Sequence, residues 1–227
     1  MSAASIIQYL LVVFLPILAI YIAYLVVTKA FNDMGFTSFE AIIIIFFSFI
    51  LGVGIIDDYV GFSFSNIPLF IYNNWLVGIN TGGAIIPLIL STYLMIKNKL
   101  YTKKILIGIV IVAIITYLVT SVNPQKGIIS PFPYWLLPVF FASVTSIFLL
   151  WKDKHKAAPF AYICGTIGVL VGADVFHLLE LLTYTISEET TAVIGGASVF
   201  DMVFITGILA VIIDGLIIYQ DKRKDAE

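Results

Sequence analysis

The chain has 227 residues, of which 61% are hydrophobic and 11% are charged, and its formal net charge is −2 at pH 7. This composition excludes a water-soluble globular domain, because a fold of this size has too little interior to hide so much apolar surface. The weak negative charge also excludes nucleic acid as a partner, since a protein that binds it would carry a basic patch. The sequence therefore predicts a multi-pass protein of the cell membrane.

Apolar segments long enough to cross a bilayer follow one another along the chain. A transmembrane helix needs about 20 residues to cross roughly 30 Å of hydrocarbon. On this measure the sequence predicts an all-α bundle of seven transmembrane helices in a single domain, residues 1–227. The predicted spans are residues 6–29, 39–58, 78–96, 104–122, 133–151, 158–182 and 192–219. Before the third span, residues 66–79 predict an interfacial or re-entrant segment with Tyr72 and Trp75 at the level of the lipid headgroups.

The positions of the basic residues predict the orientation of these helices. Eleven of the 12 fall in the segments that follow spans one, three, five and seven, and only Lys126 falls on the opposite side. Basic residues concentrate on the cytoplasmic side of membrane proteins. We therefore expect the N-terminus outside and the C-terminus in the cytoplasm, an alternation that six or eight spans would disrupt.

Parts of the first half of the chain match parts of the second half at a nearly constant spacing, which is the pattern of an internal repeat. The matching pairs are Leu15-Pro16 with Leu137-Pro138, Gly52-Val53 through Asp58 with Gly168-Val169 through Asp174, and Gly82-Gly83-Ala84 with Gly195-Gly196-Ala197. One interpretation is a parallel three-plus-one-plus-three duplication of residues 6–99 and 133–221, joined by a linker helix at 104–122, as in some transporters. The alternative is a chance similarity between short, apolar sequences.

Acidic residues inside the predicted spans are the main functional signal, because an ionisable group in a bilayer is energetically costly. Asp174 in span six and Asp201 in span seven lie at a similar predicted depth, roughly 12 to 14 Å below the outer surface. In contact, such a pair would share a proton or bind a cation. His177 and Glu180 follow Asp174 at intervals of three residues and predict a polar track toward the outside, and the repeat adds Asp58 to these candidate proton- or cation-binding residues.

Other polar residues of the spans allow several interpretations. His177 either relays protons or ligates a metal of unknown identity, or it packs as a hydrogen-bonded imidazole. Asp214 is expected to pair with a lysine from another loop or to form an inner gate. Hydroxyl groups on spans four and five are expected to bond carbonyls of their own helices, namely those of Thr116, Thr120, Ser143 and Ser146. No cofactor is expected.

Two segments rich in glycine lie beside the acidic residues. They contain Asn80, Gly82, Gly83 and Pro87 at the start of span three, and Gly195 and Gly196 ahead of Asp201. Paired glycines allow helices to approach closely, and they also allow a broken helix whose free amide groups line a cavity. The position of Gly195 and Gly196 beside Asp201 favours a binding site.

Several of these segments resemble one known family. Residues 78–88 (GINTGGAIIPL), 171–174 (VGAD), 194–201 (IGGASVFD) and 206–208 (TGI) are similar to the prokaryotic membrane family known as domain of unknown function 1614. The resemblance covers most of residues 50–215 and implies a polytopic membrane protein of archaeal or bacterial type, without an activity. Asp174 and Asp201 on neighbouring helices also resemble, more loosely, the catalytic pair of aspartyl intramembrane proteases. The Gly-x-Gly-Asp and Pro-Ala-Leu elements of those enzymes do not occur around Asp201.

Three functions are compatible with these residues, and whether the protein is an enzyme stays open. In a transporter or channel, Asp174 and Asp201 would bind a proton or cation between the two repeats. In an intramembrane aspartyl protease, one of the two would act as general base while its protonated partner polarises the scissile carbonyl. In an accessory subunit, a partner protein would satisfy the acids. The expected partners are the lipid bilayer, a proton or cation, and a homo-oligomer or larger membrane complex.

Overall fold

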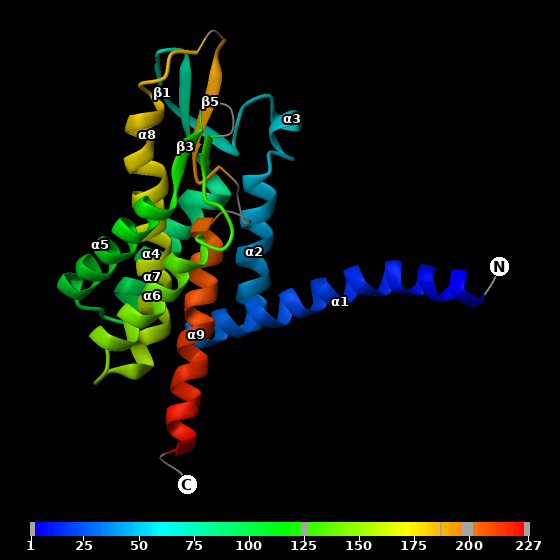
Figure 1. Cartoon of the computed structure of the whole chain (residues 1–227), viewed down its shortest axis with the longest axis vertical. Coiled ribbons are helices and arrows are strands. Elements are labelled where there is room, and N and C mark those ends of the chain that lie inside the picture. The colour runs from blue at the N-terminus through cyan, green and yellow to red at the C-terminus, as the bar shows by residue number, and fades with distance from the viewer. Residues whose placement is uncertain (1–2, 124–126, 187, 197–201, 225–227) are drawn as a thin grey trace.

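The computed structural model describes residues 3–123, 127–186, 188–196 and 202–224, and the side chains of 3–11, 58 and 219–224 lie outside the description (Figure 1). The chain is mostly helical, with 68% of its residues in helices. Three apolar helical segments are long enough to cross a membrane, namely Val12–Asp33, Thr102–Val119 and Lys154–Leu181. Four shorter apolar helices are Ser38–Gly52, Thr81–Lys97, Leu136–Leu149 and Met202–Ile218. Each of these segments overlaps one predicted span.

Figure 1 labels the elements in chain order. The α-helices are α1 (Ala3–Asp33), α2 (Ser38–Gly52), α3 (Asp57–Val60), α4 (Ile86–Lys97), α5 (Thr102–Val119), α6 (Leu136–Leu149), α7 (Ala157–Val169), α8 (Phe176–Leu181) and α9 (Met202–Lys224). Two π-helical turns are η1 (Thr81–Ile85) and η3 (Leu170–Val175), and η2 (Lys154–Lys156) is a short 3-10 helix. The strands are β1 (Asn66–Tyr72), β2 (Trp75–Asn80), β3 (Ser121–Asn123), β4 (Gly127–Ile129) and β5 (Thr190–Ile194).

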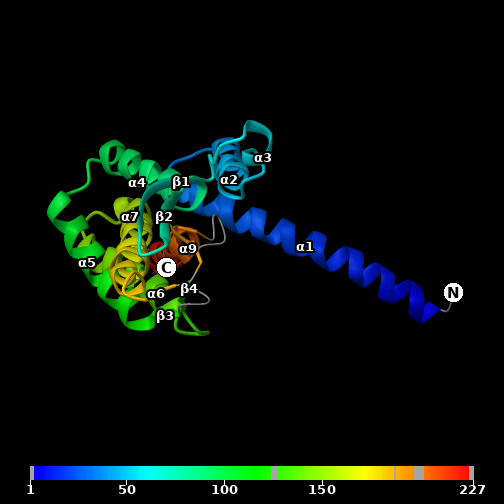
Figure 2. The ribbon, with the colours of Figure 1, turned by 90° about the horizontal axis from the view of Figure 1, so that it is seen from above.

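Helix α1 projects away from the other helices (Figures 1 and 2). Only the part near its C-terminal end packs against α2 and α9, where Thr28, Ala30 and Phe31 are buried. Residues 12–25 are exposed on every face of the helix. The first predicted span is therefore helical but does not pack along its length into the bundle. Its side chains are apolar all round, so this part of α1 requires an apolar environment.

Helix α2 shows how local sequence sets the ends of an element. Its first turn is a capping box, in which the Thr37 side chain accepts from the Glu40 amide at 3.2 Å and the Glu40 carboxylate accepts from the Thr37 amide at 2.7 Å. The helix ends at Gly52, and Gly54 then turns the chain with a φ of 82°. The helix is thus shorter than the predicted span 39–58, because this glycine turn precedes the acidic residues.

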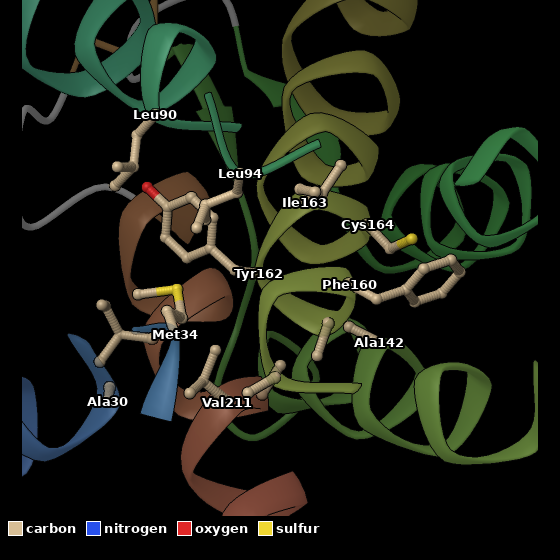
Figure 3. Close-up of a cluster of buried hydrophobic side chains, with 14 of the residues drawn as sticks. Ala30, Met34, Leu90, Leu94, Ala142, Phe160, Tyr162, Ile163, Cys164 and Val211 are labelled. Carbon is tan, nitrogen blue, oxygen red and sulfur yellow. The ribbon is translucent and has the colours of Figure 1, made fainter. Parts of the chain in front are cut away.

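Helix α7 forms the centre of the bundle and packs against α4, α5, α6 and α9. In Figure 3 the Tyr162 ring extends from α7 toward Leu90 and Leu94 of α4, whereas Phe160 and Cys164 extend to the opposite side. Cys164 is buried, as a small apolar residue would be. A Cβ on Gly168 would lie 2.6 Å from the Cβ of Val112 on α5, so glycine allows these two helices to pack closely.

A small sheet at one end of the bundle was not predicted, and the all-α prediction is wrong for this part of the chain. Strands β1 and β2 form an antiparallel hairpin, and β5 pairs with β2 in parallel. Asn73 and Asn74 make the two-residue turn with φ values of 45° and 65°, which asparagine tolerates better than most residues. The expected interfacial or re-entrant segment is therefore a β-hairpin.

The two aromatic residues beside this turn differ in their surroundings. Tyr72 is exposed, but Trp75 is 2% exposed, and its Nε1 donates a hydrogen bond to the Tyr184 carbonyl at 2.9 Å. Trp75 packs in a second small core with Leu181 and Leu182. It therefore joins the hairpin to the end of α8, and its level relative to the lipid headgroups stays a prediction.

Candidate functional site

Asp174 is bound to one of the predicted glycine segments. It lies in η3, half-buried, and its Oδ2 accepts a hydrogen bond from the backbone amide of Gly195 at 2.7 Å. Gly195 has a φ of 69°, and a Cβ at this position would lie 2.8 Å from the backbone nitrogen of Ala84. Only glycine fits both this backbone conformation and this close approach. The turn after β5 thus points the backbone amide of Gly195 at the carboxylate of Asp174.

The first glycine segment is held by Asn80, which is 1% exposed. Its amide nitrogen donates to the Gly52 carbonyl at 2.9 Å, and its amide oxygen accepts from the Gly83 amide at 2.7 Å. A Cβ on Gly82 would lie 1.9 Å from the Ser48 carbonyl oxygen, so this glycine serves close packing of η1 on α2. Pro87 is buried in the first turn of α4. Gly82 thus fits the close-packing interpretation, whereas the broken-helix interpretation stays a prediction for Gly195, which follows a strand and donates its amide to Asp174.

The glycine segments matched in the sequence lie next to each other in space. Strand β2 and strand β5 pair in register from Trp75 with Thr190 to Ile79 with Ile194, and each strand leads into its glycine pair. Gly195 contacts Gly83 and Ala84 directly, while Gly196 lies against Val193 of its own strand. The two glycine segments therefore lie side by side, each after one of two parallel strands, where η1 meets the end of β5.

Two of the predicted acidic residues lie outside what the structure describes. Asp201 is not among the described residues, so its distance from Asp174 stays a prediction. Asp58 belongs to the short helix α3, but its side chain is outside the description. Its neighbour Asp57 accepts hydrogen bonds from Phe64 and Ser65 and orders the loop before β1.

His177 and Glu180 form a pair that packs α8 against α5. His177 is 4% exposed; its Nδ1 lies 3.1 Å from Glu180 Oε2, and its Nε2 lies 3.3 Å from the Tyr117 carbonyl oxygen. Its ring also stacks on the Tyr117 ring at a centroid distance of 4.5 Å. Both ring nitrogens thus have an oxygen partner, as the packing interpretation predicts. Among the described residues, no group of three or more histidine, cysteine or acidic residues could hold a metal ion.

Among the described side chains the most buried acid is Asp214 on α9, which is 0% exposed. Ser143 Oγ on α6 donates to its Oδ1 at 2.5 Å, and Ser146 Oγ donates to its Oδ2. No lysine, arginine or histidine lies within salt-bridge distance of Asp214 among the side chains that the structure describes. The predicted lysine partner is therefore not found. A buried carboxylate with two hydroxyl donors and no counter-charge is a group that takes up a proton or a cation.

The prediction for the hydroxyl groups is confirmed on one helix and wrong on another. Thr116 donates to the Val112 carbonyl at 2.8 Å and Thr120 to the Thr116 carbonyl at 2.7 Å, within α5. Ser143 and Ser146 instead cross to α9. They lie three residues apart on one face of α6, so their spacing and their depth relative to Asp214 are the signal that could have predicted this cluster.

The interface between α7 and α9 contains further polar groups that the sequence analysis missed. Buried hydroxyl groups without a hydrogen-bond partner among the described residues are those of Ser91 on α4, Tyr162 and Thr166 on α7, and Thr206 on α9. A Cβ on Gly207 would lie 2.5 Å from Thr166 Oγ1, and one on Gly165 would lie 3.3 Å from Thr206 Cγ2. Each threonine therefore packs against the glycine of the opposite helix.

Asp174, the threonine pair and Asp214 follow one another along the length of the bundle. Eight residues of α9 separate Thr206 from Asp214, which is about 12 Å along the helix. Thr166 lies beside Thr206, and eight residues separate it from Asp174 in the opposite direction, again about 12 Å. Asp174, the threonine pair and Asp214 thus lie at three levels along the bundle, with Asp174 bonded to Gly195, the threonines between α7 and α9, and Asp214 between α9 and α6.

Comparison with known proteins supports one of the two resemblances. No curated protein and no solved structure matches the chain. The comparisons give no support to a relationship with aspartyl intramembrane proteases. The model of the family described as Protein of unknown function (DUF1614) matches residues 57–213, a range that includes both glycine segments, Asp174 and the threonine pair. The chain therefore belongs to the DUF1614 family.

Proposed function

We propose that the protein is a membrane transporter or channel that binds and moves protons or cations through the interface of α7 with its neighbouring helices. The observation that carries the proposal is Asp214, a fully buried acid that two serine hydroxyl groups hold, with no counter-charge among the described side chains. Burying such a group costs stability, so its presence indicates a function. Ionisable residues inside spans commonly mark ion or proton pathways.

The polar groups above Asp214 support a pathway. Thr166, Thr206 and Tyr162 are buried at the α7–α9 interface, and their hydroxyl groups make no hydrogen bond of standard geometry with the described residues. Such hydroxyl groups can bind water molecules or replace the hydration shell of a cation. Asp174 would accept the proton or cation at the outer end of this path, together with the predicted partner Asp201.

The apolar surface supports a membrane location. Three helices are long and apolar enough to cross a bilayer, and residues 12–25 of α1 are exposed apolar side chains with few exceptions. The predicted repeat would place the path between two related halves, as in transporters with parallel repeats. Parallel pairing of β2 with β5, each followed by glycines, supports that arrangement.

The proposal is tested by reconstituting the protein in liposomes and measuring proton, sodium and potassium flux. The unmodified chain is compared with Asp174→Asn and Asp201→Asn. Flux above that of empty vesicles, reduced by both substitutions, is the expected result. Cleavage of transmembrane reporter helices without any flux, abolished by the same substitutions, would replace transport by intramembrane proteolysis.

A further inference from the structure

A groove opens at the end of the bundle opposite to the sheet. It has a volume of about 490 Å³ and lies between the start of α5, the end of α6 and the connection to α7. The residues that characterise it are Tyr101, Lys104, Phe148, Trp151, Lys152 and Asp153. None of them belongs to the polar interface around Asp214, so the groove is a separate feature of the molecule.

Positive charge gathers around this groove. Lys104 Nζ donates to the carbonyl of Leu149, the last residue of α6, at 2.7 Å. The same Nζ lies 5.4 Å from the centre of the Tyr101 ring. Lys156 approaches the same ring at 5.9 Å. Lys154 Nζ lies 4.7 Å from the centre of the Trp151 ring. The lining itself contains two lysines, Lys104 and Lys152, and one acid, Asp153, and Lys154 and Lys156 lie beside its aromatic residues, so the groove suits an anion.

The same groove carries exposed apolar surface. Phe148 is 79% exposed, and Trp151 and Tyr101 are 62% and 57% exposed. Tryptophan and tyrosine favour the boundary between water and lipid, and lysine side chains place their apolar stems in lipid and their charges among headgroups. A small soluble anion would use the lysines but leave Phe148 without a role.

We propose that this groove binds an anionic phospholipid, with its headgroup phosphate at Lys104 and Lys152 and an acyl chain along Phe148. Basic pockets between helices at the cytoplasmic surface bind acidic lipid headgroups in this way. Lys29, Lys97 and Lys103 lie near the end of α1, at the end of α4 and at the start of α5, on the side where the positive-inside rule predicts anionic lipid.

Trp151 provides a direct probe of this site. The protein in mixed micelles is titrated with brominated phosphatidylglycerol or brominated phosphatidylcholine, and tryptophan quenching is compared with that of Trp151→Phe to isolate the Trp151 signal. We expect the anionic lipid to quench Trp151 at a lower mole fraction than the zwitterionic lipid. Lys152→Gln should raise the half-quenching mole fraction about fivefold, and a second substitution, Lys104→Gln, should raise it about fivefold again.

Lys97 gives a matched control at the same end of the bundle. Its Nζ donates to the Gly35 carbonyl at 2.9 Å and lies over the Phe36 ring, outside the groove. Lys97→Gln should leave Trp151 quenching unchanged, and thermal unfolding should show that all variants remain folded. Equal quenching by both lipids, or an equal effect of Lys97→Gln and Lys152→Gln, would overturn the proposal. Relief of quenching by millimolar inorganic phosphate would assign the groove to a soluble phosphate instead of a lipid.

Discussion

Ser143 on α6 donates a hydrogen bond of 2.5 Å to Asp214 on α9, which joins two helices through a carboxylate that has no contact with solvent. This relationship was not predicted, and it makes the stability of the bundle depend on polar groups in its interior. Hydrogen bonds to a buried charged group contribute more than those between neutral groups, and they are costly to leave unmade.

Removing both serine donors should destabilise the bundle. Ser143→Ala and Ser146→Ala each leave one oxygen of the Asp214 carboxylate without its serine donor, and we expect each to cost about 1–3 kcal/mol of unfolding free energy. The cost of each serine substitution should be smaller when Asp214 is also replaced by Leu, because each serine acts through its hydrogen bond to Asp214. Unfolding in detergent followed by circular dichroism measures these differences.

Ser91→Ala is the matched control for this prediction. The Ser91 hydroxyl is also buried but has no hydrogen-bond partner among the described residues. Its removal should leave the unfolding free energy unchanged or slightly raised, because an unsatisfied polar group is lost. A loss of stability as large as that of Ser143→Ala would show that volume, and not hydrogen bonding to Asp214, determines the effect.

Gly195→Ala should disturb the contact between β5 and η1. The substitution costs about 1 kcal/mol for the positive φ. A Cβ there also lies 2.8 Å from the Ala84 backbone nitrogen, and overpacking adds roughly 1–3 kcal/mol. Gly61→Ala separates the two effects, because Gly61 has a φ of 76° but nothing within 4 Å of a Cβ. Equal losses of stability for the two variants would contradict the close approach at Gly195.

The loop that precedes β1 should depend on pH. Burial raises the pKa of Asp57, but the hydrogen bonds from Ser65, Phe64 and Ser63 together lower it more, so the pKa lies below its usual value. The carboxylate therefore stabilises the loop above the pKa of the unfolded chain, and this contribution is lost as the pH falls through the lower folded pKa. The protection factors of the Phe64 and Ser65 amides, taken relative to the intrinsic exchange rate at each pH, should fall over that acidic range. Asp57→Ala, which has no acceptor, should show low protection factors at every pH, and retained protection in this variant would contradict the assignment.

The sequence predicts the helices of this fold better than its long-range contacts. Apolar length alone located the seven apolar helical segments, because a membrane-type helix needs little more than a run of apolar residues. The hairpin at residues 66–80 was missed because the same apolar composition suits a strand, although Asn73-Asn74 between two aromatic residues is a turn signal. The projection of α1 depends on packing near Thr28, which no local pattern reports.

The candidate site was predicted in part, for a similar reason. Asp174 and the glycine segments were identified from residue type and depth, and the structure brings Asp174 to Gly195. The cluster at Asp214 was missed because the hydroxyl groups of Ser143 and Ser146 suit their own helix carbonyls equally well in sequence. Only the packing of α6 against α9 decides between those partners.

The most direct test of the account is cation and proton flux through liposomes that contain Asp214→Asn. This variant keeps the size of the side chain and an oxygen that can accept a hydrogen bond, but it can neither release a proton nor carry a charge. Glu188→Gln, an exposed acid in the loop before β5, is the control for the loss of one negative charge. The account predicts that Asp214→Asn abolishes flux while Glu188→Gln retains it. Equal flux through the unmodified protein and Asp214→Asn would contradict it.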